Sequence, residues 1–510
     1  MNAALEKRIK RQVIGKPHRF MAVVPLGFEQ TLINEFLDIG IETTADLDHK
    51  TCDKAPSHPE RPFISGDGKV EFTAKLTEAW KAVAYSRIAN RILMEIGNFK
   101  AENFRDFEKK ASEFPWELYL DERTGYALQT KDERYLGNVI LSEAHRTKSK
   151  NPVNFCSPSL NIHVTCKHSR LYHSDAIAER LQKIIEGVSL PLTPADTASA
   201  TPSAGTPRNA PTQNLYVHFL DDRCTIWQDL AGEELYKRGH ERFVNEAPLK
   251  ETIAAAMLQE AFNTAALTTN HQPLTTLIDP MAGSGTFSLE AAYIANHLIP
   301  GSCRDFALKH QPAFKEATWK FLIRRETRDE RREKCATVSL ASHVIASTQC
   351  EAIHQPIITS DISERAIEII KHNVECSPLA DIAPNAINPK IRDFFSYTAE
   401  EIANACKSKS HPIIILNPPY GKRLDFDAPR LYTRIGRKLK ELAHDLNAIG
   451  MQLTVAILSP KDDTRNGAKY TCTANLLHEC PSLSPEHNST AKLIVTSHGG
   501  FSLNVFIAKI

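Results

Sequence analysis

Two short stretches of this chain combine acidic, amide, glycine and proline residues in an order that suits ligand binding and catalysis. The first is DPMAGSGT at 279–286, and the second is NPPYG at 417–421. The first stretch follows an apolar run and precedes an apolar-periodic segment, which indicates a buried strand, a tight turn and the start of a helix. Such a junction presents backbone N–H groups and the positive end of a helix dipole to a ligand.

The glycines of the first stretch are a weak signal when taken alone. Gly283 and Gly285 allow a close approach of the backbone or a positive φ. No Gly-Lys-Ser/Thr follows them, which excludes a Walker A loop, and Ser288 stands where a GxGxxG motif requires glycine. Several ligands therefore remain open for this turn.

The second stretch narrows these alternatives through a resemblance. An acid-tipped strand with GxG, followed downstream by an apolar strand that ends in Asn-Pro-Pro-Tyr, resembles the S-adenosylmethionine-dependent amino-methyltransferases. The resemblance implies a doubly wound α/β domain of class I (Rossmann-like) methyltransferase type, with ligand at the carboxyl ends of the strands. It also implies S-adenosyl-L-methionine as cofactor.

The NPPY residues fit the transfer of a methyl group to a planar amine. Such an amine is a poor nucleophile, because its lone pair is delocalised into the ring. The Asn417 side-chain oxygen and the Pro418 carbonyl can accept hydrogen bonds from the two N–H groups of the amine. Pro418 and Pro419 stiffen the turn that holds these two acceptors. Tyr420 offers a stacking face for a flipped base. The alternative is a rigid loop with a capping asparagine.

The resemblance implies which residues bind the cofactor. The loop residues expected to hold its methionine side are Asp279, Met281, Gly283, Ser284, Gly285 and Thr286. Asp361 would accept the ribose hydroxyls, although it could also be an N-cap. Asp393 would contact the adenine amine and Phe394 would pack on the ring, although Asp393 could also be an ordinary turn acid.

In-line displacement at a sulfonium methyl requires neither a metal nor a covalent nucleophile. The methylated amine is acidic, so no strong general base is required. We therefore expect no metal ligand in the reaction.

These residues require a sheet whose strands end beside one another. Expected strands are 274–278, 355–360, 387–391, 413–416 and 453–458, followed by a hairpin, 491–496 and 501–508, closed by a Gly-Gly turn.

The N-terminal half reads as a separate α+β region. Expected elements are a strand at 20–24 with a helix after it, and a strand from Lys69 followed by a long amphipathic helix that includes Ile92. They are followed by strand character at 118–130 and at 160–173, a helix at 175–187 and a hairpin at 214–230. Arg87 and Arg91, one turn apart, are expected on a solvated helical face.

The order of further motifs sharpens the resemblance. VEF…SRIANRIL, KRGH…APLKET, DPMAGSGT and NPPYG follow one another as in the THUMP-domain guanine-N2 RNA methyltransferases. The likeness is strongest to the N-terminal methyltransferase half of the bacterial 23S rRNA (guanine-N2)-methyltransferase family. It implies a ferredoxin-like segment at 18–68, a THUMP domain at 69–231 and a methyltransferase domain at 240–510. The Pro/Ala/Ser/Thr tract at 189–213 departs from the family pattern and is expected to be a disordered insertion.

The resemblance also implies contacts to structured RNA. The expected contact residues are Lys237, Arg238, Lys250, Lys422 and Arg423. A mixed-charge helical run at 303–335 favours a solvated helix, with Arg324, Arg325, Arg331 and Arg332 as alternative RNA contacts.

Composition bounds these interpretations. A chain of 510 residues is too long for one core, so about two to four domains are expected. A formal net charge of +1 does not suggest a bulk polyanion binder, but it leaves room for a local basic patch. The 11 cysteines form no CxxC pair, which argues against disulfides and structural zinc.

The chain contains no run long enough to span a membrane and no secretory signal, which favours the cytoplasm over a mitochondrial presequence. The oligomeric state is open. The best-known relatives carry a second methyltransferase domain, and the end of this chain at Ile510 predicts a single modification.

The favoured function is guanine-N2 methylation of large-subunit ribosomal RNA. The alternatives are a tRNA guanine-N2 methyltransferase, a DNA or protein amino-methyltransferase, and a non-catalytic RNA-binding factor.

Overall fold

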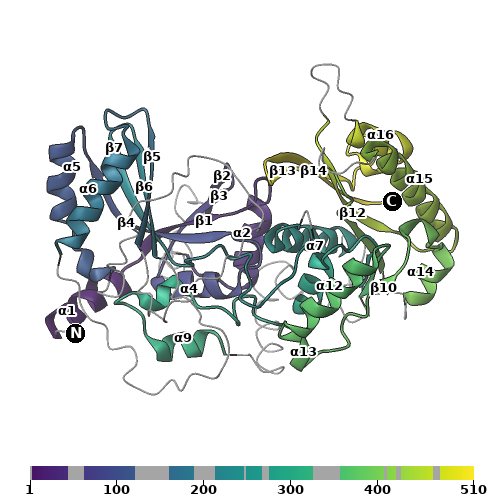
Figure 1. The fold of residues 1–510 in the computed structure, drawn as a ribbon, viewed down its shortest axis with the longest axis horizontal. Coiled ribbons are helices and arrows are strands. Elements are labelled where there is room, and N and C mark those ends of the chain that lie inside the picture. Colours follow the sequence, from purple (N-terminus) through teal and green to yellow (C-terminus); the bar gives the residue numbers. More distant parts are fainter. Residues whose placement is uncertain are drawn as a thin grey trace, which may run out of the picture.

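Two seven-stranded sheets lie side by side along the long axis of the molecule (Figure 1). The computed structural model describes residues 3–43, 63–120, 160–188, 213–245, 248–266, 275–324, 357–406, 411–420, 427–462 and 471–510. The predicted disordered insertion lies outside these residues, apart from Gln213.

The N-terminal sheet has the strand order β2-β3-β1-β4-β7-β6-β5, and only β5 and β6 pair in parallel. Its strands are β1 (His18–Val23), β2 (Phe63–Gly66), β3 (Lys69–Ala74), β4 (Arg91–Lys100), β5 (Leu160–Lys167), β6 (Gln213–Leu220) and β7 (Arg223–Asp229). Its longer helices are α2 (Glu29–Asp38), α4 (Leu76–Tyr85), α5 (Phe104–Ser112) and α6 (Ser174–Glu186). The sheet runs across the predicted boundary at 68/69, and the division into two segments stays a prediction.

The long helix predicted after Lys69 is wrong. Helix α4 ends at Tyr85, and the residues that follow lead into strand β4, which pairs with β1 and β7. The buried Glu35 carboxylate ends the helix, because it accepts hydrogen bonds from Ser86 Oγ (2.6 Å) and from the Arg87 backbone N–H (2.7 Å). Strand pairing at long range therefore overrides the local helical pattern.

Arg87 and Arg91 are consequently not on a solvated helical face. Arg87 donates to the Leu298 carbonyl, and Arg91 forms an ion pair of 2.5 Å with the fully buried Asp229. The predicted strand near Leu118 begins instead with a 3-10 turn at Trp116–Leu118, and residues after 120 lie outside the described part. The predicted hairpin at 214–230 is confirmed as β6–β7, with positive φ at Asp221 and Asp222.

The C-terminal sheet has the order β10-β9-β8-β11-β12-β14-β13, parallel except for β14 and β13. Its strands are β8 (Thr275–Asp279), β9 (Ile358–Asp361), β10 (Lys390–Ile391), β11 (His411–Leu416), β12 (Thr454–Pro460), β13 (Lys492–His498) and β14 (Phe501–Lys509). The chain order reverses between β8 and β11, which is where ligands bind in open α/β sheets. The predicted fold class is confirmed.

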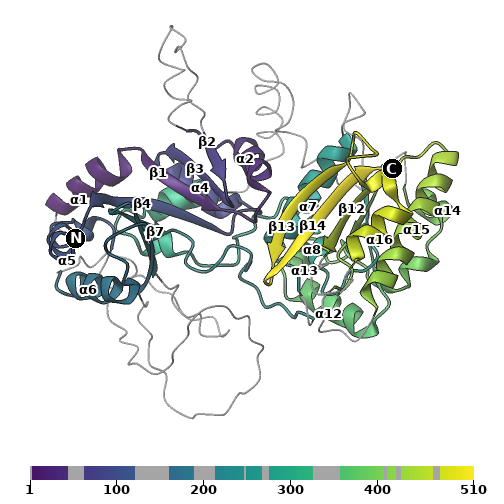
Figure 2. The same ribbon diagram turned by 90° about the horizontal axis from the view of Figure 1, so that it is seen from above.

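Helices cover both faces of this sheet (Figure 2). Ile413 and Ile415 pack in the core of one face, whereas Ile414 and Leu416 pack in the core of the other. The covering helices are α7 (Glu251–Ala266), α8 (Thr286–Ala295), α12 (Glu364–Glu375) and α13 (Leu379–Ile382) on the first side, and α14 (Ala399–Ala405), α15 (Ala428–Ala448) and α16 (Cys472–Glu479) on the second. A strand buried on both faces must be apolar at every position, as the run at 413–416 is.

The predicted terminal hairpin is confirmed as β13–β14. Gly499 and Gly500 form its turn with φ of 58° and 81°, which a residue with a Cβ rarely adopts. Among the helices of the described residues, none has the length and apolar character needed to cross a membrane.

Candidate active site

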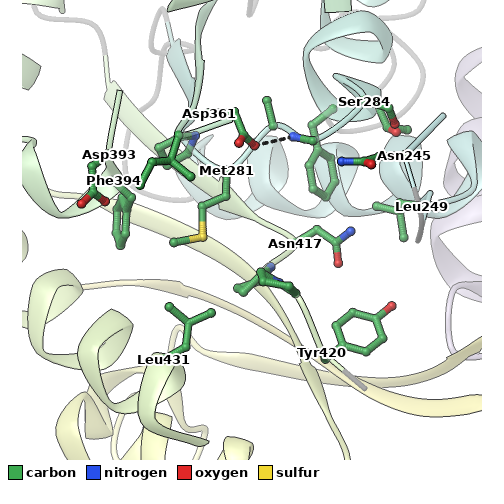
Figure 3. A pocket seen from close by; sticks show the side chains of 18 of the residues that line it. Asn245, Leu249, Met281, Ser284, Asp361, Asp393, Phe394, Asn417, Tyr420 and Leu431 are labelled. Atoms are coloured by element: carbon green, nitrogen blue, oxygen red, sulfur yellow. Dashed lines mark hydrogen bonds between the residues drawn. The ribbon is translucent and has the colours of Figure 1, made fainter. Parts of the chain in front are cut away.

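A cavity of about 470 Å³ lies at the carboxyl ends of β8, β9 and β11 (Figure 3). This volume is within the range of about 300–1,000 Å³ that is common for small-molecule sites. The lining residues are Asn245, Leu249, Pro280, Met281, Ala282, Gly283, Ser284, Thr286, Phe287, Asp361, Ile362, Asp393, Phe394, Phe395, Asn417, Pro418, Pro419, Tyr420, Leu431 and Arg434. The cavity therefore brings together both stretches singled out in the sequence. Of the residues predicted for cofactor and catalysis, Asp279 and Gly285 do not line it.

The glycine loop between β8 and α8 forms one wall of the cavity. Gly283 and Gly285 have φ of 56° and 78°, and a Cβ at Gly283 would meet no atom within 4 Å. At Gly285 a Cβ would approach the Ile370 side chain to 3.0 Å. Gly283 is therefore required for backbone conformation beside open space, whereas Gly285 also allows close packing against α12.

Asp279 lies behind this loop and is fully buried. Its Oδ2 accepts hydrogen bonds from Ser288 N (3.2 Å) and Ser288 Oγ (2.7 Å), while Oδ1 has no partner among the described residues. Burial raises the pKa of Asp279 to about 7, against the opposing effect of the Ser288 hydrogen bonds. Asp279 positions the first turn of α8, and its predicted contact with a cofactor stays a prediction.

Two further acids line the cavity and also hold turns. Asp361 accepts hydrogen bonds from Gly283 N and Ser363 N, both at 2.9 Å, so it ties the end of β9 to the glycine loop. Ser363, not Asp361, is the N-cap of α12. Asp393 accepts from Phe395 N at 3.0 Å as the N-cap of a 3-10 turn. Carboxylate oxygens keep further acceptor capacity, so these bonds are compatible with ligand binding.

Asn417 follows β11 directly and faces the cavity together with Tyr420 (Figure 3). Its Oδ1 is buried and has no hydrogen-bond partner within the described ranges. A buried acceptor without a partner costs about 1–3 kcal/mol, so a ligand donor at this atom would remove that cost. The Tyr420 ring packs edge-on against Phe501 at 6.2 Å between centroids.

Several lining residues were not predicted from the sequence. Ile362, at 71% exposure, directly follows Asp361, and Phe395 lies under the Arg434 guanidinium at 3.9 Å. Asn245 and Leu249 reach the cavity from the segment that precedes α7. An apolar residue after the acid of the second strand was an available signal, but nothing local in the sequence indicates Asn245.

Arg242 was also missed, although it lies in the motif-rich stretch before α7. Its guanidinium donates to Thr286 Oγ1 (2.5 Å) and lies 3.5 Å from Ser284 Oγ, both in the glycine loop. It also forms an ion pair with Glu251. Burial lowers the pKa of Arg242 to about 10, so it stays charged at neutral pH. Arg242 thus supports the glycine loop through these side-chain contacts.

The predicted RNA contacts separate into distinct environments. Lys237 is half exposed and pairs with Glu233, and Lys250 pairs with Glu234. Arg238 is 5% exposed and its guanidinium binds Glu290, so the structure does not support an RNA contact for it. The predicted contacts at 422 and 423 lie outside the described residues.

The predicted mixed-charge helix at 303–335 is, within its described part, a 3-10 turn at Ala307–His310 and a short helix at Glu316–Leu322. Arg324 lies 4.6 Å above the Phe321 ring, whereas residues 325–356 are outside the described part.

The strand order, the glycine loop and the Asn-Pro-Pro-Tyr turn beside it give the C-terminal half the fold and the site arrangement expected of a class I methyltransferase. Residues 238–457 match the family model described as UPF0020, RMKL-like, methyltransferase domain, which confirms the predicted resemblance.

Curated relatives agree with this class. The protein named ribosomal RNA large subunit methyltransferase K/L of Psychromonas ingrahamii is 25% identical over 77% of this chain and 43% of its own length. The protein of the same name from Allochromatium vinosum is 26% identical over 82% of this chain and 47% of its own length. The chain thus spans about half the length of these relatives. The putative RNA methyltransferase YpsC of Bacillus subtilis is 23% identical over 84% of this chain and 86% of its own length.

Solved structures support the fold. A putative methyltransferase described as complexed with SAH, SMU.472, has a TM-score of 0.58 at 20% identity, over 97% of this chain and 98% of its own. A possible methylase from Clostridium difficile 630 has a TM-score of 0.59 at 18% identity, over the same shares. At these identities the likeness establishes the fold alone.

Proposed function

We propose that this chain transfers a methyl group from S-adenosyl-L-methionine to the exocyclic N2 amine of a guanosine in large-subunit ribosomal RNA. The observation that carries the proposal is the buried, unpartnered Oδ1 of Asn417, which lines the same cavity as the glycine loop. The atom is an acceptor at the place where a planar amine must be oriented.

The cavity fits the cofactor on chemical grounds. Gly283 leaves open space at the loop, Asp361 and Asp393 offer carboxylate acceptors, and Ile362 and Phe394 offer apolar surface for a ring. When bound, the cofactor supplies an electrophilic methyl group on a sulfonium.

The residues of this chain would orient the acceptor amine. Asn417 Oδ1 and the Pro418 carbonyl accept hydrogen bonds from the two N–H groups of the amine. These bonds direct the nitrogen lone pair towards the cofactor half of the cavity. Tyr420 lies beside them as a stacking surface for an extruded base. The amine proton leaves to solvent after transfer, and no metal takes part in this step.

The choice of RNA rests on the relatives and on the N-terminal region. Several relatives are named for large-subunit ribosomal RNA, and YpsC for RNA in general. We assign RNA binding to residues 18–231, as a ferredoxin-like segment and a THUMP domain, and the methyltransferase domain to 240–510. An rRNA substrate would place the protein in the cytoplasm.

The test is to incubate the purified chain with labelled S-adenosylmethionine and with either ribosomal or transfer RNA. Label in ribosomal RNA, recovered as N2-methylguanosine, is expected. Label only in tRNA would support the tRNA alternative, and N6-methyladenosine would overturn the assignment of the amine.

A further inference from the structure

Near the glycine loop, three side chains that can bind a metal lie close together outside the cavity described above. They are Glu241, in the segment before α7, and His372 and Cys376, at the end of α12. One ligand atom from each lies within 4.8 Å of the other two. Within the described ranges no other such group of three is found.

The helical pair has the separation that a tetrahedral metal requires. Cys376 Sγ lies 3.4 Å from His372 Nε2. Zinc binds sulfur at about 2.3 Å and nitrogen at about 2.0 Å, which places two tetrahedral ligand atoms roughly 3.5 Å apart. The spacing i, i+4 across the last helical turn puts both side chains on one face.

The surrounding contacts hold the third ligand and the imidazole in place. The Phe243 ring stacks on His372 at 4.0 Å with an interplanar angle of 17°, which restricts the orientation of the imidazole. The fully buried Asn373 accepts from Phe243 N (2.7 Å) and donates to Phe243 O (2.9 Å), so the segment that carries Glu241 is fixed against α12. Two elements distant in sequence thus present their ligands from a preformed junction.

We propose that Glu241, His372 and Cys376 form a binding site for one zinc ion, which joins the segment before α7 to helix α12. A thiolate, an imidazole and a carboxylate are the ligand types that zinc prefers, and three protein ligands leave a fourth position for water. Cys376 loses its proton on binding, so each bound ion releases a proton.

The site would act on the structure of the pocket and take no part in methyl transfer. It departs from the sequence-based expectation of no structural zinc, because that expectation rested on cysteine pairs and this site uses a single cysteine. Asn373 also donates to the Ser284 carbonyl at 3.1 Å, so α12 supports the glycine loop directly. On the other element, Glu241 immediately precedes Arg242, which braces the same loop. An ion here would therefore hold together both supports of the loop.

The test uses the full chain after treatment with a chelator, titrated with Co²⁺ as a spectroscopic probe and with Zn²⁺ in competition. We expect one equivalent of Co²⁺ to produce a thiolate-to-cobalt absorption band and the visible bands of a tetrahedral site, and Zn²⁺ to displace it. Zinc should also raise the melting temperature of the chelated protein.

Cys376→Ser should remove the thiolate band, and His372→Gln should weaken binding. Loss of an outer-shell partner alone costs about 10–100-fold in affinity, so loss of a ligand should cost at least about 100-fold. Cys166→Ser, at a partly buried cysteine of β5, is the matched control and should bind like the parent chain.

Glu241→Gln gives a second variant whose side chain is exposed, so its folding is not at risk. It should keep the thiolate band but bind more weakly. An octahedral spectrum without a thiolate band, or an unchanged band in Cys376→Ser, would overturn the proposal. Because these measurements read metal binding, they are independent of the RNA methyltransferase assignment.

Discussion

Two buried oxygens without a hydrogen-bond partner among the described residues, Asn417 Oδ1 and Asp279 Oδ1, mark the two sides of the candidate site. Buried polar atoms are normally paired, so an unpaired one requires an explanation. Asn417 Oδ1 belongs to a cavity-lining side chain, where a substrate amine can supply the donor. Asp279 lies behind the cavity wall, where protonation relieves the cost of burying a charge.

Asp279 should make the stability of the chain depend on pH. Burial raises its pKa to about 7, so between about pH 4 and 7 the folded state holds a proton that the unfolded chain releases. Asp279 therefore lowers the free energy of unfolding as the pH rises through that window, on the order of 1 kcal/mol per pH unit. Asp279→Asn removes the titration and keeps an acceptor for Ser288.

The measurement is denaturant unfolding of the parent chain and of Asp279→Asn at pH 5 and pH 8. The variant should gain stability relative to the parent as the pH rises. The difference between the two proteins is the quantity to compare, because burial raises the pKa of Asp38 to about 7 as well. A difference that does not change with pH would show that Asp279 is ionised throughout.

At the scale of single residues, the sequence motifs predicted the polar side chains of the site but not the apolar residues that line it or the residues that support its loops. Asp361 ends β9, Asn417 follows β11 directly and Asp393 lies two residues after β10, so their place at one sheet edge follows from the parallel topology. Asn245 and Arg242 could not be found in this way. They reach the site through long-range packing of an irregular segment, which leaves no periodic pattern in the sequence.

At the scale of elements, the strands of the C-terminal sheet were predictable because each is a short apolar run with turn residues around it. The segment after α4 was not. Its apolar positions fit a helical stripe, but Ser86 hydrogen-bonds to the Glu35 carboxylate and the helix ends there. Strand β4 then pairs with β1 and β7. Glu35 and these two strands are distant in sequence, so the local pattern indicated a helical period and not that of a strand.

The segment between the two sheets should stabilise the glycine loop through Arg242. Arg242→Lys keeps a positive charge near Glu251 but cannot make the same set of planar contacts, so the hydrogen bond to Thr286 is lost. Loss of one hydrogen bond to a charged group should weaken cofactor binding by about tenfold. Isothermal titration with S-adenosylmethionine measures this change.

Thr286→Val, alone and combined with Arg242→Lys, completes a double-mutant cycle. If Arg242 acts through Thr286, the double variant should bind no more weakly than the weaker of the single variants. Fully additive losses would show that the two side chains contribute independently.

At the scale of the whole molecule, buried polar contacts fix the N-terminal region against the C-terminal half. Glu260 of α7 accepts from Thr31 of α2 and from Lys492 of β13, both at 2.8 Å. Arg238 contacts Glu290 of α8 at 2.9 Å and the Arg87 carbonyl at 2.9 Å. The position of the N-terminal region relative to the cavity is therefore held by hydrogen bonds that the buried side chains of Glu260 and Arg238 make to Thr31 and to the Arg87 carbonyl.

Alanine substitutions of Arg238 and of its neighbour Lys237 should distinguish a structural residue from a candidate RNA-binding residue. Arg238→Ala leaves Glu290 with Arg87 at 3.6 Å as its remaining cation, and breaking such a buried pair costs about 3–5 kcal/mol. Lys237→Ala should cost less than about 1 kcal/mol, because its ion pair with Glu233 is solvent-exposed. Denaturant unfolding measures both. Equal stabilities would contradict the structural role of Arg238.

In the proposed function, one cavity holds a cofactor on the glycine-loop side and a planar amine at Asn417. The most direct test compares methyl transfer and cofactor binding in Asn417→Ala, with Asn447→Ala, an exposed asparagine of α15, as the control. Asn417→Ala should lose transfer to RNA by at least about 100-fold while its affinity for S-adenosylmethionine stays within about threefold, and the control should match the parent chain. Unchanged turnover in Asn417→Ala would show that Asn417 does not orient the amine.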